Sequence, residues 1–154
     1  MNRQEFIIGL ISDTHGQLRP QVIKQLKKCA AIIHAGDICD NEIITRLEQM
    51  APVHAVGGNM DRRGKYPASD LIQVGGYSIY IIHDLAKIDL DLEAAGINIV
   101  IFGHSHQPER FKRGPVTFIN PGSCGPARPG RPITMARMRL TAKQIITNFI
   151  DLGK

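Results

Sequence analysis

Apolar runs and amphipathic stretches alternate along the first two thirds of the chain. The apolar runs are short and rich in Ile and Val, and they predict buried strands at residues 5–12, 31–36, 52–58 and 97–103. Apolar side chains at helical spacing predict helices at residues 18–29, 41–50 and 85–96. We expect the second helix to be capped by Asp40 or Asn41 and the third to end at Gly96.

The remaining apolar runs predict strands without helices between them. Residues 70–74 and 77–82 flank a short Gly-Gly turn and predict a hairpin. Three further strands are predicted at residues 116–122, 133–140 and 144–150. This order predicts an α/β fold with parallel central strands and added antiparallel ones. We find no linker or repeat, so we expect one domain over residues 1–154.

Composition indicates an ordinary globular protein, with 43% hydrophobic and 21% charged residues. The three cysteines form no CxxC motif, and their odd number argues against a complete disulfide framework. We therefore expect a reducing, cytoplasmic setting. The run FIIGLI is interpreted as the first strand rather than a signal peptide, and no stretch has the roughly 20 apolar residues of a membrane span.

The net charge of +5 allows two interpretations. It is either an ordinary solvated surface or a means of attracting an anionic substrate or nucleic acid. Basic residues of the C-terminal third are consistent with the second interpretation, but charge alone does not choose between the two: Arg110, Lys112, Arg113, Arg128 and Arg131. We see no interleaving of aromatic and basic residues that would indicate a nucleic-acid groove, so nucleic acid is not the expected partner.

Five apolar strands end in residues that can bind a metal. These residues are Asp13, His15, Asp37, Asn59, His83, His104 and His106. Ligands of α/β sheets bind beyond the carboxyl ends of the strands, where different loops meet. His104 and His106 lie two positions apart, and extended backbone would point both side chains to the same side.

The chemistry of this set is specific, because it combines carboxylate and amide oxygens with imidazole nitrogens and includes no thiolate. Such ligands suit divalent Mn, Fe, Zn or Ni. Seven ligands exceed the needs of one four-coordinate ion, so we expect two ions that share a carboxylate, with His104 and His106 on different ions. His34 and His54 lie inside apolar strands and are expected to be packing residues rather than ligands.

The motifs DTH, GD, GNMD and GHSH, with a strand-end His before the last, resemble those of the calcineurin-like metallophosphoesterases. The segment INPGS at residues 119–123 is similar to the small bacterial and archaeal phosphodiesterase branch. The resemblance implies a four-layer αββα sandwich with mixed β-sheets. It also implies that Asp37 bridges two ions, one held by Asp13, His15 and His106 and the other by Asn59, His83 and His104.

The function implied by this resemblance is metal-dependent hydrolysis of a phosphate ester. A metal-bound hydroxide would be the nucleophile, two Mn ions are expected with Fe, Zn or Ni as alternatives, and Asn59 would also donate to a phosphate oxygen. A phosphodiester is the favoured small-molecule substrate, and a phosphomonoester or nucleotide is the alternative. A non-catalytic scaffold similar to the retromer subunit of this fold is the competing class. Relatives are often dimers or tetramers, so a homo-oligomer is also expected.

Two positions depart from the family pattern. Met60 stands where many relatives have a His that is thought to act as general acid, and a thioether cannot donate a proton. Asp84 follows His83 where relatives usually have Gly, and it is a candidate for orienting that imidazole. The INPGS segment is interpreted either as an ordered loop alone or as backbone that shapes the rim of the site.

Overall fold

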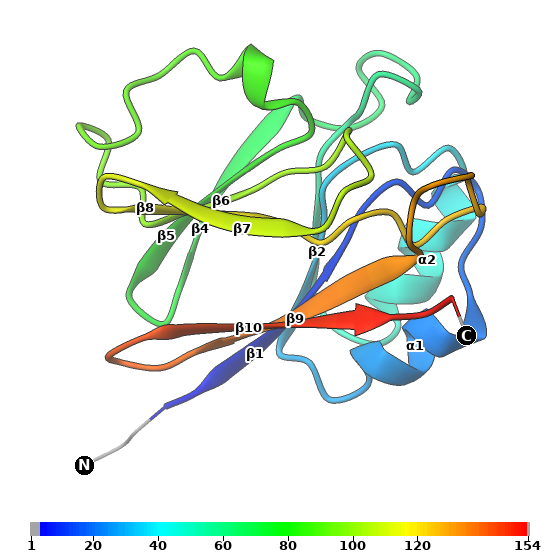
Figure 1. The fold of residues 1–154 in the computed structure, drawn as a ribbon, viewed down its shortest axis with the longest axis horizontal. Helices are drawn as coiled ribbons and strands as arrows, with labels where there is room; N and C mark the ends of the chain where they lie inside the picture. Colours follow the sequence, from blue (N-terminus) through cyan, green and yellow to red (C-terminus); the bar gives the residue numbers. More distant parts are fainter. Residues whose placement is uncertain (1–3, 154) are drawn as a thin grey trace.

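Two five-stranded sheets pack face to face in the computed structural model, which describes residues 4–153 (Figure 1). The first sheet consists, in spatial order, of β10 (Ile145–Asp151), β9 (Thr134–Leu140), β1 (Phe6–Ile11), β2 (Ala31–His34) and β3 (Val53–Ala55). The second consists of β4 (Ser69–Val74), β5 (Tyr77–Ile82), β6 (Ile99–Ile101), β8 (Val116–Asn120) and β7 (Glu109–Arg113).

Both sheets are mixed. In the first, β1, β2 and β3 run parallel, and β9 and β10 are antiparallel additions at one edge. In the second, β5, β6 and β8 run parallel, and β4 and β7 are antiparallel strands at the two edges. The prediction of parallel central strands with antiparallel additions is confirmed, as is the hairpin of β4 and β5.

The main core lies between the sheets. Alternate residues of the central strands, such as Ile8 and Leu10 of β1 and Ile79 and Ile81 of β5, meet there and are fully buried. The intervening residues are buried as well, because a second layer covers the outer face of each sheet. Burial on both faces explains why these strands appear in the sequence as continuous apolar runs.

Two helices cover the outer face of the first sheet and lie at the right of Figure 1. The first, α1 (Pro20–Leu26), begins at a proline and ends before Lys27, where the backbone turns extended, so it is shorter than predicted. The second, α2 (Asn41–Glu48), is capped as expected by Asp40, whose side chain accepts a hydrogen bond from the main-chain nitrogen of Glu42 at 3.0 Å.

The predicted helix over residues 85–96 is wrong. Only the 3-10 helix η1 (Leu85–Lys87) forms, followed by turns. Ile88, Leu90 and Leu92 all pack on the outer face of the second sheet. Their spacing of two residues suits irregular or extended backbone, whereas a helix would direct them to different faces. The sandwich of mixed sheets is confirmed, with its fourth layer made of η1 and these turns.

Strand β7 was not predicted. Its side chains are mostly charged and exposed, Phe111 packs onto the sheet, and the Arg113 guanidinium lies over the rings of Phe111 and Phe118. An edge strand with polar side chains carries little apolar signal. Arg110, Lys112 and Arg113 therefore lie on a strand and not in a loop. Within residues 4–153, no helix is long and apolar enough to cross a membrane.

Candidate metal centre

The seven residues predicted as ligands meet at one end of the sandwich. Asp13 and His15 follow β1, Asp37 follows β2, Asn59 follows β3, His83 follows β5, and His104 and His106 follow β6. Two contact groups can be distinguished among them, and the carboxylates of Asp13 and Asp37 each lie 3.3 to 3.8 Å from imidazole nitrogens of both groups.

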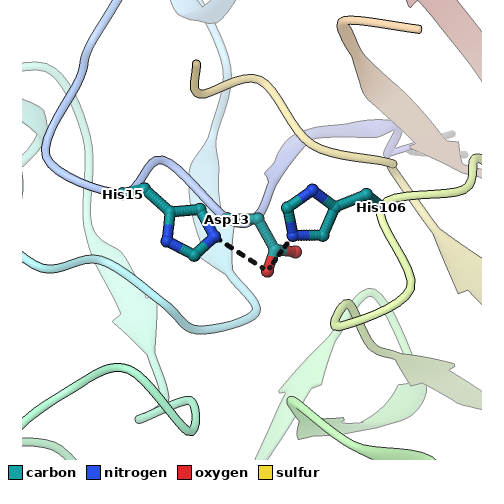
Figure 2. A group of neighbouring side chains, drawn as sticks. All are labelled: Asp13, His15 and His106. Carbon is teal, nitrogen blue, oxygen red and sulfur yellow. Dashed lines mark ion pairs between the residues drawn. The ribbon is translucent and has the colours of Figure 1, made fainter. Parts of the chain in front are cut away.

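The first group is Asp13, His15 and His106 (Figure 2). The Oδ1 atom of Asp13 lies 3.7 Å from Nε2 of His15 and 3.3 Å from Nε2 of His106. The two imidazole rings are 5.3 Å apart between centroids. Figure 2 shows that both rings direct a nitrogen toward the same carboxylate oxygen.

The second group is Asn59, His83 and His104. The Oδ1 atom of Asn59 lies 3.1 Å from Nε2 of His83 and 3.2 Å from Nδ1 of His104. His83 and His104 stand edge to face, with ring centroids 5.2 Å apart. His104 is open to solvent, with 48% of its side-chain surface exposed.

Asp37 lies between the two groups. Its Oδ2 atom is 3.7 Å from Nε2 of His15 and 3.3 Å from Nε2 of His83. Its other oxygen, Oδ1, accepts a hydrogen bond from the main-chain nitrogen of Met60 at 2.8 Å. One oxygen is therefore fixed by the protein and the other faces both groups.

Asp13 is held in the same way. Its Oδ2 accepts from Ser12 Oγ at 2.6 Å and from the main-chain nitrogen of His104 at 3.2 Å. Its Oδ1 is buried and, like Nε2 of His15, has no hydrogen-bond partner within residues 4–153. Buried polar atoms normally find partners. Two such atoms, an acidic oxygen and an imidazole nitrogen directed at one point, fit a bound cation.

The spacing of these atoms also fits metal ions. Two atoms that ligate one ion at about 2.1 Å lie roughly 3.0–3.6 Å apart. The separations around Asp13 Oδ1, Asp37 Oδ2 and Asn59 Oδ1 range from 3.1 to 3.8 Å. Oxygen and imidazole donors together suit the divalent transition metals.

The charges in the site are coupled. Burial alone raises the pKa of Asp37, but hydrogen bonds from His83 and from the Met60 main chain lower it below the usual value. Burial raises the pKa of Asp13, an effect that Ser12 and the nearby imidazoles only partly offset. Burial lowers the pKa of His83, yet the neighbouring carboxylates raise it above the usual value. A cation would replace the protons that this cluster otherwise retains.

His83 is oriented by the main chain and not by Asp84. Its Nδ1 donates to the carbonyl oxygen of Ala35 at 2.8 Å, which leaves Nε2 facing Asp37 and Asn59. Asp84 instead accepts from the main-chain nitrogen of Ala86, and its other oxygen lies 4.0 Å from Nε2 of His104. The expectation that Asp84 orients His83 is therefore wrong.

The ligand loops have left-handed backbone. Within residues 4–153, seven residues other than glycine have positive φ, and all but Lys28 belong to three of the five ligand loops: Asp13, His15, Asp37, Cys39, His104 and His106. The expectation that extended backbone sets His104 and His106 side by side is wrong. Their φ angles are 75° and 62°, and their rings face different groups.

Two supporting residues were missed as functional positions. Asp61, the last residue of GNMD, accepts hydrogen bonds from the main-chain nitrogens of Ile38, Cys39 and Gly58 at 2.8 to 2.9 Å. It thereby ties the Asp37 loop to the Asn59 loop. The signal was present, since an Asp inside a turn motif commonly binds main-chain nitrogens.

Asn120, from INPGS, is the other. It is fully buried and donates from Nδ2 to the carbonyl oxygen of Gly103 at 3.1 Å and to Ser105 Oγ at 3.0 Å. Ser123 of the same segment donates to the carbonyl oxygen of Asp13 at 3.0 Å. This segment therefore supports two ligand loops through side chains.

His34 is a packing residue, as predicted. It is fully buried, accepts from the main-chain nitrogen of Gly36 at 3.1 Å through Nδ1, and lies 2.9 Å from Thr14 Oγ1 through Nε2. Thr14 in turn donates to the carbonyl oxygen of Ile38 at 3.1 Å. Burial lowers the pKa of His34 to about 3, so the ring is neutral. His54 lies half-buried in β3 and is not part of the centre.

A two-sheet sandwich with Asp, Asn and His gathered at its strand ends defines a class of protein, the metallophosphoesterases. Residues 6–143 match the calcineurin-like phosphoesterase superfamily domain, and the chain belongs to that superfamily. It is 31% identical to a probable metallophosphoesterase of Methanothermobacter thermautotrophicus, in an alignment that covers 96% of this chain and 93% of that protein.

Solved structures share the fold. A structure described as a novel archaeal phosphodiesterase superposes with a TM-score of 0.78 at 21% identity, covering 96% of this chain and 100% of the other. Vacuolar protein sorting 29 of Cryptosporidium parvum gives a TM-score of 0.77 at 19% identity, covering 97% and 99% of the two chains.

Proposed function

We propose that this protein hydrolyses a phosphodiester with two divalent metal ions, Mn first among them and Fe, Zn or Ni as alternatives. Membership of the superfamily supports the reaction class. The arrangement of Asp37 between two groups of nitrogen and oxygen donors supports the number of ions. The likeness in fold to an archaeal phosphodiesterase makes a diester the favoured substrate.

In this proposal Asp13, His15 and His106 hold one ion, Asn59, His83 and His104 hold the other, and Asp37 contacts both. Bound ions would neutralise charge on the phosphoryl oxygens and lower the pKa of a bound water towards about 7.

The protein side chains would prepare the site before any substrate arrives. The lowered pKa of Asp37 keeps its carboxylate ionised, as a shared ligand requires. The bond from His83 to Ala35 fixes the tautomer that leaves Nε2 free for an ion. Asn59 uses only its oxygen toward the imidazoles, so its amide nitrogen can donate to a phosphate oxygen.

The position of Asp37 is the observation on which the proposal depends, and metal stoichiometry tests it. The metal-free protein should take up about two Mn ions per chain. Asp37→Ala should impair both sites together, His106→Ala should weaken one, and Asp151→Ala, on the edge strand β10 and outside the ligand set, should change neither. Full stoichiometry and activity in Asp37→Ala would remove the bridging role.

A scaffold on the same fold is the second candidate, because vacuolar protein sorting 29 shares it. All seven ligand-type residues are present here and lie together, which favours the enzyme. Chelation should abolish hydrolysis of diesters and added Mn should restore it. If a folded, metal-loaded sample cleaves neither diesters nor monoesters, the scaffold is favoured, whereas preference for monoesters would indicate a phosphatase or nucleotidase.

The proposal includes a reducing, cytoplasmic setting, which is supported by three free cysteines. A dimer or tetramer stays a prediction that size-exclusion chromatography with light scattering can test.

A further inference from the structure

A pocket opens directly beside the second ligand group, and the proposed metal ions leave it free. Its volume is about 350 Å³, and Asn59 and His83 form part of its lining. Pockets of roughly 300–1,000 Å³ are typical of small-molecule sites. A phosphate group next to these two residues would therefore have room for one of its ester groups in the pocket.

The inner wall of this side pocket is largely apolar. Tyr80 and Ile82 line it from β5, and Ala68 lines it from the segment just before β4. Tyr80 and Ile82 are buried and belong to the packed outer face of the second sheet, so this wall is rigid. An apolar wall of this kind suits the C–H face of a ring.

The rim is charged, and it comes from η1 and the turn that follows. Asp84, Lys87 and Asp89 line this side. Asp84 already accepts from the Ala86 main chain, whereas Lys87 and Asp89 form no ion pair within residues 4–153. Two carboxylates and one ammonium would disfavour a second anionic group. They offer several acceptors and one donor to neutral hydroxyl groups.

A purely apolar ester group would fit the wall but not the rim. It would make no hydrogen bonds to the exposed charged groups of Lys87 and Asp89 on the rim. A hydroxyl-bearing ring of sugar size satisfies both parts of the pocket.

We propose that the side pocket binds a neutral, hydroxyl-bearing organic group of the phosphodiester, of sugar or polyol type, with its C–H face on Ile82 and Ala68 and its hydroxyls on Asp89 and Lys87. This inference rests on the proposed function and specifies its substrate class.

A set of p-nitrophenyl phosphodiesters tests the pocket, with methyl, phenyl or ribosyl as the second ester group. The wild type should cleave the ribosyl ester with a kcat/KM at least about tenfold above those of the methyl and phenyl esters. Ala68→Leu, which narrows the pocket, and Asp89→Asn, which removes a charged acceptor, should each reduce this preference. Both variants should leave metal content and methyl-ester hydrolysis unchanged, and Asp151→Asn is the matched control for the lost charge.

The outcomes separate this inference from the proposed function. If the methyl ester is cleaved but the ribosyl ester is not preferred, or if both pocket variants retain the preference, the side pocket has no such role. A phenyl preference would overturn it in favour of an aryl-binding pocket. If the metal-loaded wild type cleaves none of the esters, the proposed function fails and the substrate assignment fails with it.

Discussion

Acidification should destabilise this protein through His34, a residue outside the metal centre. The imidazole is fully buried and bonded to the Gly36 main chain and to Thr14. Burial lowers its pKa to about 3, whereas a histidine in an unfolded chain titrates near about 6.5. Below about pH 6.5, His34 therefore binds a proton in the unfolded chain but stays neutral in the folded protein.

The sign and size of the effect follow from this difference in proton uptake. The free energy of unfolding is unaffected by His34 above about pH 6.5 and falls by about 1.4 kcal/mol per pH unit as the pH drops from there towards 3. At about pH 5 the loss from this one residue is roughly 2 kcal/mol, a large share of the 5–15 kcal/mol typical of small proteins.

Urea unfolding of the chelated protein between about pH 7.5 and 5 measures this loss. His34→Gln should be less stable than the wild type at neutral pH, by about 1–3 kcal/mol for the lost bonds and packing. That gap should shrink by roughly 2 kcal/mol at about pH 5, because glutamine does not titrate. His54→Gln, on the neighbouring strand, is the matched control for replacing a histidine by glutamine. Parallel pH curves for wild type and His34→Gln would refute the buried neutral imidazole.

Three further predictions concern the ligand loops. A Cβ atom added at Gly58 would lie against the Asp37 carboxylate, so Gly58→Ala should lower metal occupancy and reduce the free energy of unfolding by about 1–3 kcal/mol. Gly57→Ala is the control and should be tolerated, because a Cβ atom there would lie 3.5 Å from its nearest neighbour. Equal urea midpoints for the two variants would contradict this. Asp61→Asn should lose about 1.5–3 kcal/mol of unfolding free energy, since its carboxylate accepts three main-chain bonds, and an unchanged midpoint would show that the amide suffices. Met60 is 61% exposed and cannot donate a proton, so kcat/KM should fall steeply as the pKa of the leaving group rises. Met60→His should raise kcat/KM for alkyl esters by up to about 10²-fold. A kcat/KM of the wild type that does not depend on leaving-group pKa would mean that another acid protonates the leaving group.

Strands and ligand residues were predictable because they have strong local signals. A strand buried on both faces must be apolar throughout, and the polar residue at its end is then conspicuous. The helix prediction over residues 85–96 failed because Ile88, Leu90 and Leu92 alternate with Asp residues and all pack on the second sheet, a spacing that the sequence shows and that does not suit a helix. Strand β7 was missed because an exposed edge strand needs few apolar residues and so gives little apolar signal in the sequence.

The supporting contacts of the site were harder to predict, because they join segments far apart in the chain. Asn120 donates to Gly103 and Ser105 of another loop, and Asp61 binds the loop after β2. Nothing in the local pattern around either residue specifies these partners. The seven ligand-type residues were identified from their side-chain chemistry, but the backbone that presents them was not.

That left-handed backbone determines what it would take to transplant this centre into another protein. Asp13, His15, Asp37, His104 and His106 all have φ between 45° and 75°, and such conformations cost of order 1–3 kcal/mol each for residues other than glycine. Seven matching side chains grafted onto ordinary strand ends would relax into extended backbone and point elsewhere. A functional graft would also need the hydrogen bonds that Asp61 and Asn120 make to these loops. The smallest unit that could be transferred is therefore the ligand loops together with the residues that hold them.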